Sequence, residues 1–232
     1  MNEPATQLAS LLQRVEVAVS QRGRGERREA PALLLAVSKT RTAGEIRNLA
    51  AQGQHRFGEN YVQEALAKQR ELGDAGIEWH LIGHLQSNKA REAATAFDWV
   101  QTVDRMRLIP ALARHRPAAR GPLNVLIQVN IDDEASKSGC RPDEVEALAD
   151  AIAAEDRLAL RGLMAIPAPD PDMQRRRAAF QSMKNLFDAL AVRYPRIDAL
   201  SMGMSEDFEL AIAEGATLVR VGTALFGVRT RP

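Results

Sequence analysis

Lys39 is the first residue of the chain whose position suggests chemistry. It follows Leu33-Leu34-Leu35-Ala36-Val37-Ser38, and this apolar run is typical of a short strand buried on both faces of a parallel sheet. Thr42-Ala43-Gly44-Glu45 has the capping-box pattern that begins a helix, so Lys39 is predicted at the carboxyl end of a first strand. A lysine in a partly dry site loses its proton more easily and attacks an aldehyde. Taken alone, the run favours a lysine that only ends a strand at the surface, but the rest of the chain reverses that interpretation.

Two later loops have the composition of a phosphate site. Ser201-Met202-Gly203-Met204-Ser205 and Val221-Gly222-Thr223-Ala224 each place glycine and hydroxyl residues where a helix is predicted to begin. Glycine lets the backbone approach an anion closely, and the N–H groups of a first helical turn bind it. Either loop alone is explained by ordinary turn and capping chemistry, but barrel enzymes often bind phosphate with the loops after strands seven and eight. Glu206 and Asp207 would compete with an anion, so this hypothesis requires both carboxylates to point away.

Arg220 precedes the second of these loops and alternates with two valines. In a strand over 217–221, Val219 and Val221 would face the outer helices and Arg220 would point into a barrel. A buried arginine requires an acceptor, which is either a strand carboxylate or a ligand heteroatom. A lysine, an arginine and a phosphate site together fit pyridoxal 5′-phosphate (PLP), whose aldehyde, pyridine nitrogen and phosphate they would meet. An arginine at that nitrogen keeps it unprotonated and makes the ring a weaker electron sink.

The elements that would position these residues alternate between strand and helix. Strands are predicted at 33–37, 56–60, 78–82, 99–103, 123–130, within 158–166, at 199–202 and at 217–221. Helices are predicted at 5–22, 42–52, 61–72, about 89–96, 105–115 with Asp104 as its cap, 142–155, 173–194, 206–214 and 224–227. This alternation in 232 residues predicts an α/β protein, a TIM (β/α)8 barrel with an extra N-terminal helix, forming one PLP-binding domain over 1–232. The alternative is an open doubly wound sheet, which is weakened because no Gly-x-Gly-x-x-Gly follows the first strand.

Charge, cysteine content and hydropathy exclude several classes of protein. The chain has 31 basic and 30 acidic residues and a formal net charge of +1, which does not suggest a nucleic-acid or membrane partner. Cys140 is the only cysteine, so the chain has no internal disulfide framework and a reducing compartment is the simplest context. Residues 1–20 lack the apolar core of a signal peptide, and no window approaches the ~20 apolar residues of a membrane span. We therefore expect a soluble, cytoplasmic protein.

These residues lie in stretches that closely resemble the pyridoxal phosphate homeostasis proteins, single-domain relatives of the alanine racemase barrel. The matching stretches are LLLAVSKT (33–40), FGENYVQEA (57–65), EWHLIGHLQSNK (78–89), LNVLIQVNI (123–131), SKSG (136–139), LRGLMAIP (160–167), LSMGMSEDFELAI (200–212) and VRVGTALFG (219–227). They cover most of the chain from residue 33 onward, whereas residues 1–32 match little. His84 stands where many members of the family have proline.

The resemblance implies a role for each part of the site. Lys39 would carry PLP as an internal aldimine, Asn60 would lie near the ring, and Arg220 would meet the pyridine nitrogen. With the loop residues identified above, the predicted phosphate-binding set is Ser201, Gly203, Met204, Ser205, Gly222 and Thr223.

Other candidate residues favour plainer interpretations. His80 and His84 have a metal-like spacing, but His80 lies on a predicted strand and no third ligand accompanies them. Cys140 precedes a helix, which can activate a thiol, yet a passive loop thiol is preferred. Lys137 could form a transient second aldimine, although a solvated loop lysine is preferred, and Lys89 is the other lysine to consider for such labelling.

Three functions fit the predicted site. The first is a protein that carries or buffers PLP as a lysine aldimine in vitamin B6 and amino-acid homeostasis, without turnover. The second is a PLP-dependent amino-acid racemase, and the third is a PLP-independent barrel acting on a phosphorylated metabolite through Lys39. Racemisation needs acid–base groups on both faces of the substrate α-carbon. The only tyrosines are Tyr61, at the start of a predicted helix, and Tyr194, at the end of one, and the chain has no room for the second domain of the racemases. We therefore favour the carrier, expected as a monomer that is not an enzyme, with PLP-dependent apoenzymes as candidate recipients.

Overall fold

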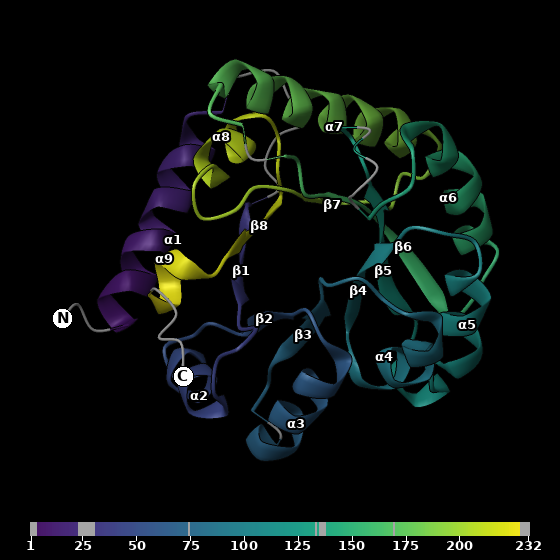
Figure 1. Cartoon of the computed structure of the whole chain (residues 1–232), viewed down its shortest axis with the longest axis horizontal. Coiled ribbons are helices and arrows are strands. Elements are labelled where there is room, and N and C mark those ends of the chain that lie inside the picture. The colour runs from purple at the N-terminus through teal and green to yellow at the C-terminus, as the bar shows by residue number, and fades with distance from the viewer. Residues whose placement is uncertain are drawn as a thin grey trace.

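A closed parallel barrel forms the centre of the computed structural model, which describes residues 4–22, 31–73, 75–132, 134, 138–168 and 170–227. The strands are hydrogen-bonded in chain order, β1 to β8, and β8 pairs with β1 (Figure 1). They are β1 Leu33–Val37, β2 Arg56–Glu59, β3 Glu78–Leu81, β4 Trp99–Val103, β5 Leu123–Val129, β6 Leu158–Ala165, β7 Ala199–Ser201 and β8 Leu218–Val221. This closure confirms the predicted TIM barrel and excludes the open doubly wound sheet.

Helices form a ring around the barrel (Figure 1). They are α1 Pro4–Ser20, α2 Ala43–Ala50, α3 Val62–Leu72, α4 Ala90–Ala96, α5 Leu108–His115, α6 Val145–Ala153, α7 Met173–Arg193, α8 Phe208–Ala213 and α9 Thr223–Phe226, with short 3₁₀ helices at Ser87–Lys89, Ala118–Arg120 and Pro142–Glu144. None of the helices described here is long and apolar enough to cross a lipid bilayer.

The extra N-terminal helix packs beside the last helices of the chain. Leu8, Leu11, Val15 and Ala18 are buried at helical spacing on one side of α1, which lies against α8 and α9. After α1, the Arg22 guanidinium donates through Nε to the Ile212 carbonyl at 2.7 Å. The two ends of the described chain therefore cover the side of the barrel where β8 meets β1.

The cap predicted for one helix is wrong. The helix predicted at 105–115 begins at Leu108, and Asp104 does not cap it. Instead, the Asp104 carboxylate pairs with Arg105 and lies 3.7 Å from Nδ1 of His84. Asp104 directly precedes the helix predicted at 105–115, a position where aspartate often caps a helix, but its carboxylate pairs with Arg105 instead.

The apolar core has two layers. The outer layer lies between strands and helices and includes the fully buried Phe57, Phe180 and Phe208. Two smaller apolar clusters lie apart from it, one of Trp99, Leu126, Met164 and Ala199 and one of Leu35, Ile82 and Leu218. These residues alternate along their strands with the outer layer, so they fill the barrel interior. Polar strand residues that share this inward side must find hydrogen-bond partners there.

Candidate functional site

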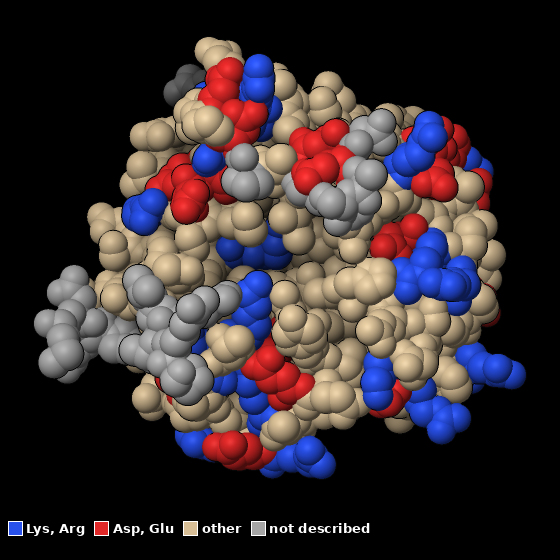
Figure 2. All heavy atoms as spheres, viewed as in Figure 1, with Lys and Arg blue, Asp and Glu red and all other residues tan. Residues whose placement is uncertain are grey.

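A cavity of about 220 Å³ opens where β2, β3, β5 and β6 end. Its lining residues are Asn60, Ile82, Gly83, His84, Gln128, Ser138 and Ile166. Viewed as in Figure 1, the molecule is hollowed at its centre, and lysine or arginine side chains lie within the hollow (Figure 2). The carboxyl ends of the strands are where a barrel of this kind places chemistry.

The backbone on both sides of Lys39 is held by residues of β2 and α3. Ser38 is fully buried; its N–H donates to the Gly58 carbonyl at 2.9 Å, and its hydroxyl donates to Glu59 Oε1 at 2.6 Å. Thr40 has a φ of +65°, a strained conformation for a β-branched residue, and its N–H donates to Glu64 Oε1 at 2.5 Å. The half-buried Lys39 thus lies in a turn whose conformation is held by hydrogen bonds to β2 and α3.

A buried lysine joins these supports. Lys68 Nζ donates to the Ser38 carbonyl, to Glu59 Oε1 and to Glu64 Oε1, each at 2.7 Å. The Lys68 side chain is 8% exposed and the Glu59 side chain is 0% exposed. Burial raises the pKa of Glu59, while the hydrogen bonds from Lys68 and Ser38 oppose that shift. Among the described residues, Glu59 Oε2 has no hydrogen-bond partner, so the carboxylate depends on what surrounds Oε1.

Asn60 reaches the cavity because a glycine, Gly83, lies just after the end of β3. A Cβ added to Gly83 would lie 2.1 Å from the Asn60 carbonyl oxygen, a distance that no side chain tolerates. The glycine therefore lets the two loops touch and brings Asn60 and His84 to the same cavity.

Arg220 points into the barrel, as the alternation of its strand predicts. It is 3% exposed, lies opposite Leu35 of β1 and donates to the Ser201 hydroxyl and the Ala165 carbonyl, each at 2.7 Å. Its observed acceptors are thus a hydroxyl and a carbonyl rather than the strand carboxylate that was the alternative. Burial lowers the pKa of Arg220 to about 10, against the opposing charge of Asp207, and the guanidinium remains protonated at neutral pH.

The two predicted phosphate loops lie together beside β1. The Gly222 N–H donates to Ser205 Oγ at 3.4 Å, and a Cβ added to Gly222 would lie 3.3 Å from the Cβ of Val37. Thr223 is the first residue of α9. These contacts bring the end of β1, which leads to Lys39, next to both loops.

Two details of these loops differ from the prediction, and a third, at Gly203, adds to it. Asp207 does not point away, because its Oδ1 accepts from the Met204 N–H at 2.7 Å, whereas Glu206 is exposed. Gly203 has a φ of +90°, and a Cβ there would lie 2.5 Å from the Cβ of Ala211, so close helix packing requires this glycine. The Ser201 side chain is buried inside the barrel and donates to Gln101 Oε1. Sequence spacing alone did not separate a residue at the end of β7 from the loop that follows it.

The remaining candidates occupy varied positions. His80 is buried in the barrel and His84 lines the cavity. Burial raises the pKa of the Cys140 thiol to about 12, so the nearby helix start does not activate it. Lys89 Nζ lies 3.5 Å from Glu92 Oε1 on the surface, and Lys137 lies outside the described residues.

Sequence reasoning missed the residues that support the site. No local pattern connects Glu59 with Lys68, because their contact depends on how α3 packs on β2. The inward polar side chains of β3 and β4, His80 and Gln101, were detectable in principle, because they alternate with apolar residues along their strands.

Comparison with known proteins agrees with this geometry. The family model of the alanine racemase N-terminal domain matches residues 18–230. The pyridoxal phosphate homeostasis protein of Escherichia coli K12 is 50% identical over 232 residues, covering 99% of this chain and 98% of that protein. PipY of Synechococcus elongatus PCC7942 has been solved without PLP (TM-score 0.86) and with PLP bound (TM-score 0.82), at 38% identity over 97% of this chain and 100% of PipY.

The fold and the site therefore define a barrel of the alanine racemase N-terminal class. Within that class, the chain belongs to the family of pyridoxal phosphate homeostasis proteins.

Replacing Lys68 with methionine should destabilise the protein by about 3–5 kcal/mol, the usual cost of leaving one buried charge without its partner. The fully buried Glu59 would then have a pKa raised further above its ordinary value of 4.5. As the pH falls, the folded variant therefore binds a proton at Glu59 at a higher pH than the unfolded chain does. The deficit should therefore be largest at pH 8 and shrink towards pH 5. Urea unfolding at both pH values measures it.

The matched control is Lys89→Met, which removes a half-exposed lysine with a single carboxylate at 3.5 Å. Its effect should stay within about 0.5 kcal/mol. Equal unfolding free energies for the two variants would contradict the structural role of Lys68.

Proposed function

We propose that this protein binds PLP at the mouth of its barrel, holds it covalently through Lys39, and carries or buffers it without turning over amino acids. The observation that carries the proposal is the meeting of the end of β1, Arg220 of β8 and the Ser205–Gly222 contact in one place. Membership in a family whose members are named for PLP homeostasis supports it, as does the PLP-bound structure of PipY.

The residues fit the chemical groups of PLP. PLP supplies an electrophilic aldehyde and an electron-withdrawing ring when bound. The amine of Lys39 is the nucleophile for that aldehyde, and its side chain is half-buried beside the barrel mouth. The Ser205 hydroxyl and the N–H groups of Gly222 and Thr223 are donors for the phosphate.

Arg220 determines whether the pyridine nitrogen of bound PLP carries a proton. A guanidinium has five N–H donors and no acceptor, so it can only donate to the pyridine nitrogen. With a pKa of about 10, Arg220 keeps its proton at neutral pH and leaves that nitrogen unprotonated. An unprotonated ring withdraws electrons weakly, which suits storage of PLP better than stabilisation of a carbanion.

Neither tyrosine is placed to act as the second acid–base group of a racemase. Tyr61 is 64% exposed at the start of α3, and the Tyr194 hydroxyl donates to Asp150 on the outer ring of helices. Neither lines the mouth cavity formed by the described residues. The absence of both tyrosines from this cavity supports binding and release of PLP over racemisation of the tyrosine-assisted kind.

The first test is the identity of the linked lysine. The protein loaded with PLP should be yellow, and borohydride reduction followed by peptide mass mapping should place the pyridoxyl group on Lys39. Lys39→Ala should lose the label, whereas Lys89→Ala should keep it. Labelling mainly at Lys89 or Lys137 would show that another lysine holds the cofactor.

The second test concerns the phosphate. Gly222→Leu should weaken PLP binding about tenfold to a hundredfold, since one charge-assisted hydrogen bond is worth about 1.5–3 kcal/mol and the new side chain crowds Val37 and the anion. Fluorescence titration measures the affinity and circular dichroism checks the fold. Gly44→Leu, whose Cβ would meet only Thr42 Oγ1 at 3.8 Å, is the control and should bind normally. A folded Gly222→Leu protein with unchanged affinity would remove Gly222 from the site.

The third test concerns turnover. Incubation of the PLP-loaded protein with L-alanine in deuterated water should give no more α-proton exchange than free PLP gives. Nuclear magnetic resonance of the α-proton signal follows the reaction. Enzyme-like exchange that Lys39→Ala abolishes would instead favour the racemase.

A further inference from the structure

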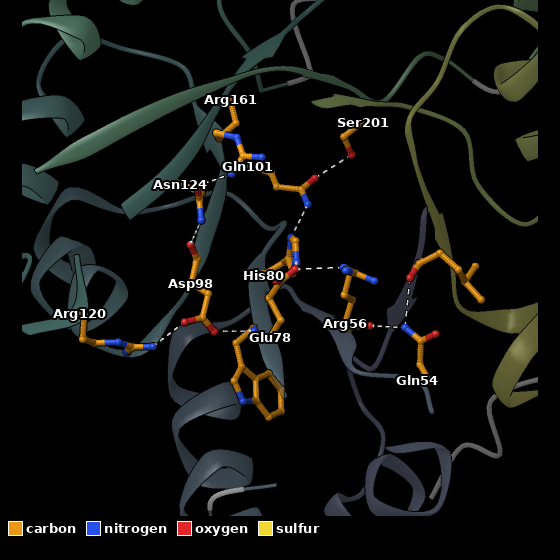
Figure 3. A network of polar contacts seen from close by, with 12 residues as sticks. Gln54, Arg56, Glu78, His80, Asp98, Gln101, Arg120, Asn124, Arg161 and Ser201 are labelled. Atoms are coloured by element: carbon orange, nitrogen blue, oxygen red, sulfur yellow. Dashed lines mark hydrogen bonds and ion pairs between the residues drawn. The ribbon is translucent and has the colours of Figure 1, made fainter. Parts of the chain in front are cut away.

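Four polar side chains meet inside the barrel, where layers of apolar side chains are usual. Their exposed fractions are 1% for His80 of β3 and 0% for Gln101 of β4 and Ser201 of β7, with 3% for Arg220 of β8. Figure 3 shows three of them in line, from Ser201 through Gln101 to His80. Buried polar groups are costly without partners, so their arrangement needs a specific explanation.

The hydrogen bonds between them have one direction. Arg220 donates from Nη1 to Ser201 Oγ at 2.7 Å, so the Ser201 proton is directed to Gln101 Oε1, also at 2.7 Å. The amide nitrogen of Gln101 then donates to Nδ1 of His80 at 2.9 Å, which requires that ring nitrogen to be bare. The proton of neutral His80 is therefore on Nε2, which donates to Glu78 Oε1 at 2.8 Å.

The hydrogen-bonded series Arg220, Ser201, Gln101, His80 and Glu78 is called the relay below. The residues at its two ends can act only as donor or only as acceptor. A guanidinium can only donate and an ionised carboxylate can only accept, so the order from Arg220 to Glu78 cannot be reversed. The hydrogen bond from His80 lowers the pKa of Glu78 and keeps it ionised. Glu78 is 36% exposed, pairs with Arg56 at 3.3 Å, and lines a second cavity of about 320 Å³ at the opposite, amino-terminal end of the strands.

The surroundings keep His80 neutral and its ring fixed. Burial lowers its pKa, against the charge of Glu78 and Asp98 and together with that of Arg56. Its ring stacks on Trp99, with centroids 5.2 Å apart and planes 10° apart. A neutral, oriented imidazole is what the Gln101 amide requires as its acceptor.

We propose that Ser201, Gln101 and His80 are positioning residues, which orient the guanidinium of Arg220 and set how strongly it donates to the ring nitrogen of the cofactor, through a relay anchored on Glu78. This inference rests on the proposed function. Hydrogen bonds in a chain polarise one another, so an ionised acceptor at the far end strengthens the pull of Ser201 on Arg220. Breaking the relay frees Arg220 to donate more strongly to the ring. The electron demand of the bound ring is thereby controlled from the opposite end of the barrel.

The first experiment needs no cofactor. Nuclear magnetic resonance of the ¹⁵N-labelled imidazole in the full chain should show Nδ1 bare and the proton on Nε2 of His80. A neutral His80 with its proton on Nδ1 overturns the relay, whatever the protein does with PLP.

The second experiment measures the pH at which the absorption spectrum of bound PLP changes. In Gln101→Leu this midpoint should fall by about one pH unit, roughly a tenfold change in proton affinity, because a more strongly donating Arg220 draws electrons from the ring. Reduction and mapping in the same samples show whether PLP is still on Lys39. An unlabelled wild-type protein refutes the proposed function, whereas a labelled Gln101→Leu protein with the wild-type midpoint refutes only the relay.

Glu78→Gln changes the partly exposed end of the relay and keeps every buried side chain in the sequence unchanged. It should lower the midpoint by a smaller amount in the same direction. The matched control is Asp198→Asn, which removes a carboxylate from the same cavity but pairs with Arg161 and stands outside the relay. Equal midpoints for Glu78→Gln and Asp198→Asn would show that only cavity charge matters and would overturn the proposal.

Discussion

The guanidinium of Arg220 inside the barrel is the constraint from which much of the interior follows. A cation buried among strands must be given acceptors, because an unsatisfied charged group is far more costly than the apolar residue that could replace it. Ser201 and Ala165 provide them, and the Ser201 hydroxyl then needs an acceptor of its own. Gln101 accepts from Ser201, and His80 accepts from Gln101. The series of hydrogen bonds ends at Glu78, which is partly exposed to solvent. The two smaller apolar clusters occupy other parts of the interior.

A second set of buried charged residues, Lys68 and Glu59, lies between the barrel and its helices. It supports the part of the site that contains Lys39. Lys68 and Glu59 hold the backbone beside Lys39 rather than contacting the cavity. Buried ion pairs add little net stability compared with apolar packing. Here the three hydrogen bonds of Lys68 connect the Ser38 carbonyl with β2 and α3. Two separate polar networks therefore hold the backbone beside Lys39 and the side chain of Arg220, and the molecule is hollowed at its centre in Figure 2. Such a combination agrees with the proposed storage and release of PLP.

Comparison of expectation and structure separates local from distant causes. The helix starts predicted from capping patterns hold for Thr42, whose side chain and that of Glu45 form the reciprocal cap. They fail for Asp104, whose carboxylate is taken by Arg105. The sequence predicts that Gly203 lets an anion approach, and the close contact with Ala211 is a second reason for a glycine there. A glycine or an acidic residue in a sequence indicates a close contact or a charged partner, but it does not identify the group that makes the contact.

The sequence by itself determined the alternation of strands and helices, the barrel class, the position of Lys39 at a strand end and the inward direction of Arg220. These follow from hydrophobic period and side-chain alternation, which are properties of a few neighbouring residues. Only the tertiary structure decided which groups accept hydrogen bonds from Arg220. The same holds for the hydrogen bonds by which Lys68 holds the turn at Lys39, and for the relay that ends at Glu78. Gln101 and Ser201 are 100 positions apart in the chain and touch because barrel closure brings β4 and β7 face to face across the interior. Such contacts depend on the register and closure of the whole sheet, and no local pattern contains that information.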